Sequence, residues 1–278
     1  MRRNLKYLKP GPKQTMLCVL VGGALAVIMP GLAQQSNSGL RLYDSFDDNR
    51  FLDPSKWLAQ WQCGGTVMEC VREIQDDHLR LRVRAYGATD SNDGTQFGTS
   101  GLTLASNSVT DIATELTVRR STADACSTNP GFGGGGGHAQ VLIYGNFFNG
   151  GGGTSDSDVT ANLQLDRYSS DSPGVVLAGG FLKYQGQFFD HVDLGPVNVG
   201  EHVRVELLWD QPNHRFVIRL FRPAYGSFAE QVMPYAISDT TAAVSPSRNI
   251  NAYVYPANCS GTRTSAELEV LINDVLTK

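Results

Sequence analysis

The sequence predicts an all-β protein built as a two-layer antiparallel sandwich. Apolar and polar residues alternate through most of the chain after residue 38, with the period of two that is typical of half-buried strands. No segment has a long 3.6-residue period, so helices that connect parallel strands are not expected. Turn residues such as Asp76-Asp77 and Asp93-Gly94 separate the alternating segments.

The segment His78–Tyr86 shows the alternation most clearly, with Leu79, Leu81 and Val83 on one face and three arginines on the other. Ten further strands are predicted from the same pattern. They are Thr66–Gln75, Phe97–Leu104, Val109–Arg119, His138–Phe147, Val159–Tyr168, Val175–Tyr184, His202–Trp209, Arg215–Phe221, Ile250–Tyr255 and Ser265–Val275.

Residues 1–33 have the composition of a secretory signal peptide. Five basic residues and no acid precede an apolar run from Met16 to Ala33, which ends in small residues suited to signal peptidase. An uncleaved membrane anchor is the alternative, because the run is close to the roughly 20 residues that a span requires. Residues 34–278 are then one secreted, periplasmic or cell-envelope domain, with no second membrane span.

Cleavage makes the domain more acidic. It removes five of the 23 lysines and arginines and none of the 27 acids, so the mature net charge is about −9. Nucleic acid is not an expected partner, because phosphate binding requires clustered cations.

Four cysteines remain after cleavage, and an even number in an exported chain predicts two disulfides. Three pairings are open. We favour Cys63 with Cys70, closing a short loop, and Cys126 with Cys259, joining distant strands. A zinc site is the alternative, but there is no C-x-x-C pair and no accompanying histidine pattern.

Four short motifs resemble the concanavalin A-like lectin/glucanase superfamily, including laminin-G-like domains of bacterial secreted proteins. The first is Phe46-Asp47-Asp48 followed by Leu52-Asp53-Pro54 and Lys56-Trp57, and the second is Arg72-Glu73-Ile74 with the strand that ends Tyr86-Gly87. The third is Val141 to Asn149, and the fourth is the closing segment Leu268 to Val275. The resemblance covers most of the mature chain and implies a two-sheet jelly roll with one concave and one convex face.

The resemblance also implies a choice among carbohydrate-binding modules, glycoside hydrolases, polysaccharide lyases and non-catalytic modules, which the fold alone does not make. Laminarinase-type hydrolases carry Glu-x-Asp-x-x-Glu on one strand, and retaining hydrolysis needs two carboxyls about 5 Å apart. Here Asp111 and Glu115 share a strand face, as do Glu267 and Glu269, but the full pattern is absent. Glu115 is the candidate catalytic residue, and solvated strand-face acids are the alternative interpretation.

Lyases of related folds use a Tyr or His base beside Arg and Gln. His138, Gln140 and Tyr144 alternate onto one strand face, and a second set, Arg82, Arg84 and Tyr86, onto another. If both faces line one groove, they form a cleft for an acidic sugar, bound through arginine. An exposed basic face and a separate polar face are the alternative.

Aromatic stacking and calcium are two further expectations. Trp57, Trp61 and Trp209 offer platforms for sugar rings, of which Trp61 is the best exposed candidate and Trp209 is expected to be packed. The resemblance implies a structural calcium ion held by Asp47 and Asp274, with Asp44 and Asn273 assisting, and calcium prefers such hard oxygen ligands.

These observations favour an exported, non-catalytic domain that binds carbohydrate or another surface ligand. A carbohydrate-active enzyme, either a lyase or a glycoside hydrolase, is the first alternative. A structural or adhesive envelope module without a small ligand is the second.

Overall fold

The computed structural model describes residues 39–47, 51–58, 63–90, 96–127 and 136–278, so the predicted signal peptide at 1–33 lies outside them. Nearly all of the regular structure in these residues is β-strand, and they contain three single-turn 3-10 helices at Ser155–Ser157, Gln211–Asn213 and Pro223–Tyr225. None of the helical segments in the described residues is long and apolar enough to cross a membrane.

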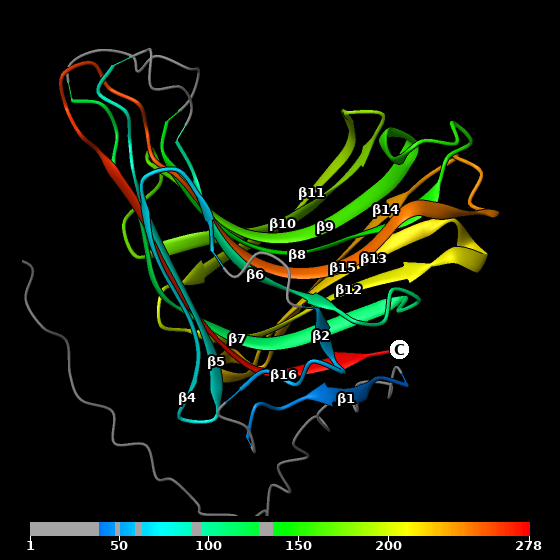
Figure 1. Ribbon diagram of the computed structural model, residues 1–278. Helices are drawn as coiled ribbons and strands as arrows, with labels where there is room; N and C mark the ends of the chain where they lie inside the picture. The colour runs from blue at the N-terminus through cyan, green and yellow to red at the C-terminus, as the bar shows by residue number, and fades with distance from the viewer. Residues whose placement is uncertain (1–38, 48–50, 59–62, 91–95, 128–135) are drawn as a thin grey trace, which may run out of the picture. The chain divides into compact units, whose positions relative to one another are not determined.

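The strands form two eight-stranded sheets, and every strand pairing in the described residues is antiparallel (Figure 1). Sheet A has the order β14 (Ser227–Pro234), β13 (Arg215–Arg222), β12 (His202–Asp210), β7 (Asp111–Ala123), β16 (Ser265–Thr277), β5 (His78–Tyr86) and β4 (Met68–Gln75), and β1 (Arg41–Asp44) pairs with β16. Sheet B has the order β11 (Gln187–Asn198), β10 (Val175–Tyr184), β9 (Asp158–Tyr168), β8 (His138–Asn149), β15 (Thr241–Tyr255), β6 (Gly98–Leu104) and β2 (Trp57–Leu58), and β3 (Gly64–Gly65) pairs with β6. The sequence predicts this two-sheet antiparallel sandwich.

The core lies between the two sheets and is built from the apolar phase of each alternating strand. In β5 every second residue from Leu79 to Ala85 is fully buried, and in the other sheet Ala139, Val141 and Ile143 of β8 are fully buried in the same core. Figure 1 shows both sheets curved in the same sense, with the concave side of β8, β9 and β15 turned away from sheet A. The alternate residues of each strand point away from the core and form the outer faces of the two sheets.

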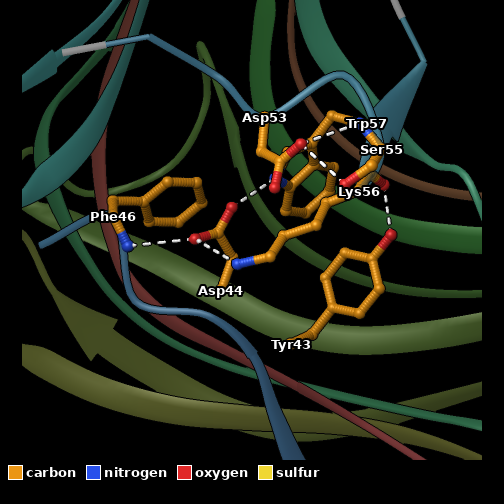
Figure 2. A network of polar contacts seen from close by, with 7 residues as sticks. All are labelled: Tyr43, Asp44, Phe46, Asp53, Ser55, Lys56 and Trp57. Carbon is orange, nitrogen blue, oxygen red and sulfur yellow. Dashed lines mark hydrogen bonds and ion pairs between the residues drawn. The ribbon is translucent and has the colours of Figure 1, made fainter. Parts of the chain in front are cut away.

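The two ends of the N-terminal motif are held together by hydrogen bonds and ring packing. Figure 2 shows the buried Asp44 carboxylate accepting hydrogen bonds from Trp57 Nε1 at 2.6 Å and from the Phe46 amide at 3.3 Å, with Lys56 Nζ 3.4 Å away. The Tyr43 hydroxyl donates to the Lys56 carbonyl. Trp57 is 3% exposed and its ring packs against Phe46 and Tyr43. The motif fastens β1 to β2, and Trp57 is a core residue, not a sugar platform.

Both predicted disulfides are present. Cys63 pairs with Cys70, and Cys126 pairs with Cys259 across 133 residues of sequence. The longer cross-link removes much of the freedom of the unfolded chain, on the order of 4–5 kcal/mol in the loop-entropy treatment. The alternative zinc site is therefore wrong, because all four thiols are used.

Ten of the predicted strands overlap an observed strand within a few residues at each end, and His78–Tyr86 and Val175–Tyr184 have the bounds of β5 and β10. The eleventh, Ile250–Tyr255, is only the second half of β15, which starts at Thr241. The longer strands β11 and β14 have no counterpart in the prediction, and neither do the two-residue strands β2 and β3.

Candidate functional site

The outer face of sheet B, here called the concave face, is the strongest candidate for a ligand site. Its residues fall into four rows that run across the strands, since directly paired residues of antiparallel strands share a face. From one end of the face to the other, the rows are Tyr255–His138–Tyr168; Thr99–Tyr253–Gln140–Asp166–Leu177; Gly101–Asn251–Leu142–Gln164–Gly179; and Thr103–Asn249–Tyr144–Asn162–Phe181.

The rows are rich in amides and aromatic rings and contain no arginine or lysine. Many of the amide side chains are buried although they lie on an outer face: Asn162 is 3% exposed and Asn249 is 6% exposed. Gln140, Tyr144 and Tyr253 are half-buried and remain open to contact from outside. The face therefore combines a fixed polar floor with accessible aromatic and amide groups.

Hydrogen bonds between these side chains fix the floor. Tyr144 Oη accepts from Asn251 Nδ2 at 3.1 Å, and Thr103 Oγ1 donates to Asn249 Oδ1 at 2.6 Å. The backbone permits this packing at Gly101, where a Cβ would lie 1.9 Å from Asn251 Oδ1. Burial raises the pKa of Tyr144 to about 12, a nearby Tyr253 acting in the same direction. Tyr144 is therefore a neutral hydroxyl group at physiological pH.

A second chain of hydrogen bonds runs along β9. Asn162 Nδ2 donates to Gln164 Oε1 at 3.4 Å, and Gln164 Nε2 donates to Asp166 Oδ2 at 2.6 Å. Asp166 is 4% exposed, and its Oδ1 has no hydrogen-bond partner. Gln140, its neighbour on β8, makes no side-chain hydrogen bond with the described residues, so both groups retain unused bonding capacity.

Aromatic rings cover the end of the concave face next to Asp166. The His138 ring stacks on Tyr255 with centroids 4.5 Å apart and lies 5.3 Å from Tyr168. Tyr253 and Tyr255 are parallel at 5.9 Å. Burial lowers the pKa of His138, so the imidazole is neutral near pH 7. The predicted grouping of His138, Gln140 and Tyr144 on one face is present, and this is the concave face.

The other predicted ligand-binding set lies elsewhere. Arg82, Arg84 and Tyr86 belong to β5 of sheet A and point away from the core, so they occupy the outer face of the opposite sheet. A single groove lined by both sets is therefore wrong. The periodicity fixed the face of each strand correctly, but it carries no information about which sheet a strand joins.

The outer face of sheet A is a network of ion pairs. Glu267 is buried between Arg82 Nη2 at 2.7 Å and Arg120 Nη1 at 3.2 Å. Hydrogen bonds from both arginines outweigh the effect of burial and hold the pKa of Glu267 below its usual value. Arg84 lies over the Tyr86 ring at 4.9 Å, and Tyr86 Oη donates to Glu69 at 2.6 Å.

The candidate catalytic Glu115 also lies on sheet A. Its Oε2 lies 3.3 Å from Nε2 of His202 on β12, and it belongs to the other sheet from the concave face. Asp111 shares its face, as predicted, but is 1% exposed. Burial and then Glu206 raise the pKa of Asp111 to about 7, while Arg219 and two further cations act against the rise. Glu269 pairs with Arg80 at 3.0 Å, so Glu267 and Glu269 both serve as ion-pair partners.

Two further tryptophans were considered as sugar platforms. Trp61 lies outside the described residues. Trp209 is packed against Phe147 and Phe148 and donates to Tyr235 Oη at 2.7 Å, in agreement with the prediction that it is packed.

Asp274 is close enough to Asp47 for electrostatic repulsion. Burial, then Glu115, then Asp47 raise the pKa of Asp274. Asp44, expected to assist, is instead committed to Trp57 and Lys56. Among the described residues no three acidic, histidine or cysteine side chains gather as cation ligands. Calcium at Asp47 and Asp274 therefore stays a prediction that would require carbonyl or water oxygens.

Several residues of the concave face were missed in the sequence. Asn249, Asn251, Tyr253 and Tyr255 follow one another at every second position, and so do the polar residues of β9 from Thr160 to Tyr168. The same period of two that identified the strands therefore also marked these residues as one outer face.

Comparisons with known proteins return structures but no sequence family. No family model and no curated protein matches the chain. A sialidase is similar with a TM-score of 0.42 and 11% identity over 86% of this chain, which spans only 18% of the sialidase. Lectin II from Ulex europaeus is similar with a TM-score of 0.34 and 14% identity, over 82% of this chain and 99% of the lectin. A scytalido-glutamic peptidase is similar with a TM-score of 0.35 and 8% identity, over 58% and 65% of the two chains. These names include binding proteins and enzymes, and similarity at this level assigns this chain neither a fold family nor a function.

Proposed function

We propose that the protein is an exported, non-catalytic jelly-roll domain that binds carbohydrate on the concave face of sheet B. The observation that carries this proposal is the set of four registered rows, in which amides are linked by hydrogen bonds and aromatic rings lie beside them on the concave side of a curved sheet. Two disulfides support export, because such cross-links persist in oxidising compartments.

The chemistry of the rows suits sugar rings. Amide side chains both donate and accept hydrogen bonds, as sugar hydroxyl groups require, and Gln140 has its bonding capacity unused among the described residues. Tyr168, which is 44% exposed, and Tyr253 offer ring faces for the apolar side of a sugar.

The alternative enzymatic functions have less support in the same rows. Retaining hydrolysis needs two carboxyls about 5 Å apart, and the four rows contain one carboxylic acid, Asp166. A lyase that acts on uronates needs positive charge beside its base, whereas the predicted arginines lie on sheet A. Tyr144, with its pKa raised to about 12, is a poor base.

A glycan array scored for both retention and cleavage tests the proposal. We expect the secreted domain to retain at least one class of glycan without shortening it. Tyr253→Ala and Gln140→Ala should each weaken binding about tenfold, which corresponds to about 1.4 kcal/mol. Tyr86→Ala is the matched control, because Tyr86 is also a half-buried strand tyrosine but lies on sheet A.

Three outcomes contradict the proposal. Cleavage of a retained glycan would favour the enzyme. Equal losses in Tyr253→Ala and Tyr86→Ala would move the site away from the concave face. A folded domain that retains no glycan on the array would favour the structural or adhesive role.

A further inference from the structure

One buried carboxyl group on the concave face has an oxygen that the protein does not use. Asp166 lies in the second row between Gln140 and Leu177, and Gln164 donates to its Oδ2. Its Oδ1 has no hydrogen-bond partner although the side chain is 4% exposed. Leaving such an acceptor unsatisfied costs about 1–3 kcal/mol, so the position favours a ligand that supplies a donor.

The electrostatic surroundings of Asp166 are negative. The charged group that acts on it is Asp171, in the turn after β9, and in the described part of the chain no cation pairs with it. Burial and then Asp171 raise the pKa of Asp166 to about 7. Buried acids are ordinarily paired, as Glu267 is on sheet A. A positive group is therefore the missing partner.

Aromatic rings border the same position. Tyr168 follows Asp166 by two residues on the same face, and His138 lies beside Tyr168. Tyr253 faces Gln140 across the β8–β15 pair. Ring faces attract cations by roughly 0.5–2 kcal/mol, depending on desolvation. A carboxylate bordered by rings is a recognised chemical setting for an ammonium group.

We infer that Asp166 receives the protonated amino group of an amino sugar, so the preferred ligand is a glycan with free amines. The inference rests on the proposed function and specifies its substrate class. The ammonium group donates to Asp166 Oδ1, and the amides of the third row remain for hydroxyl groups. An acidic glycan is disfavoured, because the four rows contain no arginine or lysine. A lysine-bearing peptide offers the same cation but does not use the amide floor.

Calorimetric titration with oligomers of glucosamine and of N-acetylglucosamine, equal in length, tests the inference. The two ligands differ at the nitrogen, which is a basic amine in the first and a neutral amide in the second, so the titration is run at a pH at which the amine is protonated. We expect the full secreted domain to bind the glucosamine oligomer about tenfold more tightly. Asp166→Asn keeps the shape of the side chain and removes its charge, so the preference should fall to about twofold or less. Asp111→Asn is the matched control, because Asp111 is an equally buried acid on sheet A, and its variant should keep the preference.

The outcomes separate this inference from the proposed function. Binding of both oligomers with equal affinity, lost in Tyr253→Ala, would overturn the amine inference and leave carbohydrate binding intact. Retained preference in Asp166→Asn would also overturn it. A lysine oligomer that displaces the glucosamine oligomer at equal concentration would show recognition of a cation alone, against an amino sugar. Failure to bind either oligomer would overturn the inference, and only an array without any retained glycan would remove the proposed function as well.

Discussion

The outer faces of the two sheets solve the problem of buried polar groups in opposite ways. On sheet A acids and arginines form ion pairs: Glu267 lies between two arginines, and Arg219 lies between Glu206 and Glu230. Two buried groups of this face, the Asp111 carboxylate and Arg84 Nε, have no hydrogen-bond partner. On the concave face of sheet B, amides and hydroxyls bond to one another in chains, and one chain ends at the free oxygen of Asp166. The two faces therefore differ in their charged groups: cations lie near the buried acid of sheet A, whereas Asp166 has a second acid beside it and no cation among the described residues.

One buried acid on each face, Asp111 on sheet A and Asp166 on sheet B, shows how the surroundings of such groups differ. The pKa values of Asp111 on sheet A and of Asp166 on sheet B are both raised to about 7, chiefly by burial. Asp111 has Arg219, Lys278 and Arg204 near enough to oppose that shift, and Asp166 has only a second acid. Burial alone is thus common to both, and the absence of a neighbouring cation in the described chain distinguishes Asp166 as a ligand site.

The largest effect is expected from Asp166→Asn on stability at alkaline pH. An acid whose folded pKa is raised above the unfolded value of 3.8 is held protonated by folding, so stability falls as the pH rises from about 4 to about 7. The variant removes this loss. It should be more stable than the parent by roughly 2–4 kcal/mol near pH 8 and nearly equal near pH 4.

Urea denaturation at both pH values measures this difference in the absence of glycan. Asp193→Asn is the control, because its carboxylate is 84% exposed on the same sheet and its removal should change stability little at either pH. A variant that is destabilised equally at both pH values would show that Asp166 is satisfied as it stands.

Glu267→Gln should have the opposite effect on the other face. Removing the charge leaves Arg82 and Arg120 without their shared partner, so the free energy of unfolding at pH 7 should fall by about 1–3 kcal/mol. Because the folded pKa of Glu267 is lowered, its contribution is present above the unfolded value of 4.5 and is lost as the pH falls through the folded pKa.

The loss of unfolding free energy in Glu267→Gln should therefore shrink in acid. The gain in Asp166→Asn should shrink in acid as well. Glycan binding should be unchanged in Glu267→Gln at pH 7. A loss of glycan affinity without a loss of stability would show that the two faces are not independent.

The period of two made the strands and their faces predictable. His78–Tyr86 and Val175–Tyr184 were bounded correctly because each has one buried and one open face, and the alternation is therefore strong. The strands β11 and β14 were missed because they lie at sheet edges with both faces largely exposed, which removes the alternation, and β11 contains Pro196 as well.

The site was only partly predictable for a different reason. His138, Gln140 and Tyr144 are on one strand, so their common face followed from local geometry. Their neighbours Asp166 and Tyr253 lie 26 and 113 residues beyond Gln140 in the sequence, and pairing between strands is a tertiary property. Because the sequence does not show which sheet a strand joins, Arg84 of sheet A and Tyr144 of sheet B were expected in one groove.

A smaller effect is expected at the seam of Asp47 and Asp274, where calcium remains a prediction. Two carboxylates that repel each other are relieved by a cation, so saturating calcium should raise the melting temperature by about 2–4 °C, or about 1 kcal/mol. Asp274→Asn should abolish the increase. An identical melting temperature in calcium and in EDTA would show that no calcium ion binds at Asp47 and Asp274.

The smallest effect is expected from Glu73→Gln on sheet A. Glu73 pairs with Arg80 at 2.8 Å, but its side chain is 46% exposed, and Arg80 retains Glu269 as a second partner. Exposed pairs contribute little, so the loss should be under about 0.5 kcal/mol and should disappear in high salt. A loss as large as that of Glu267→Gln would mean that the ion pairs of sheet A act as one coupled network. In that case the ion pairs along β4, β5 and β16 would stabilise the protein together, and not through the burial of Glu267 alone.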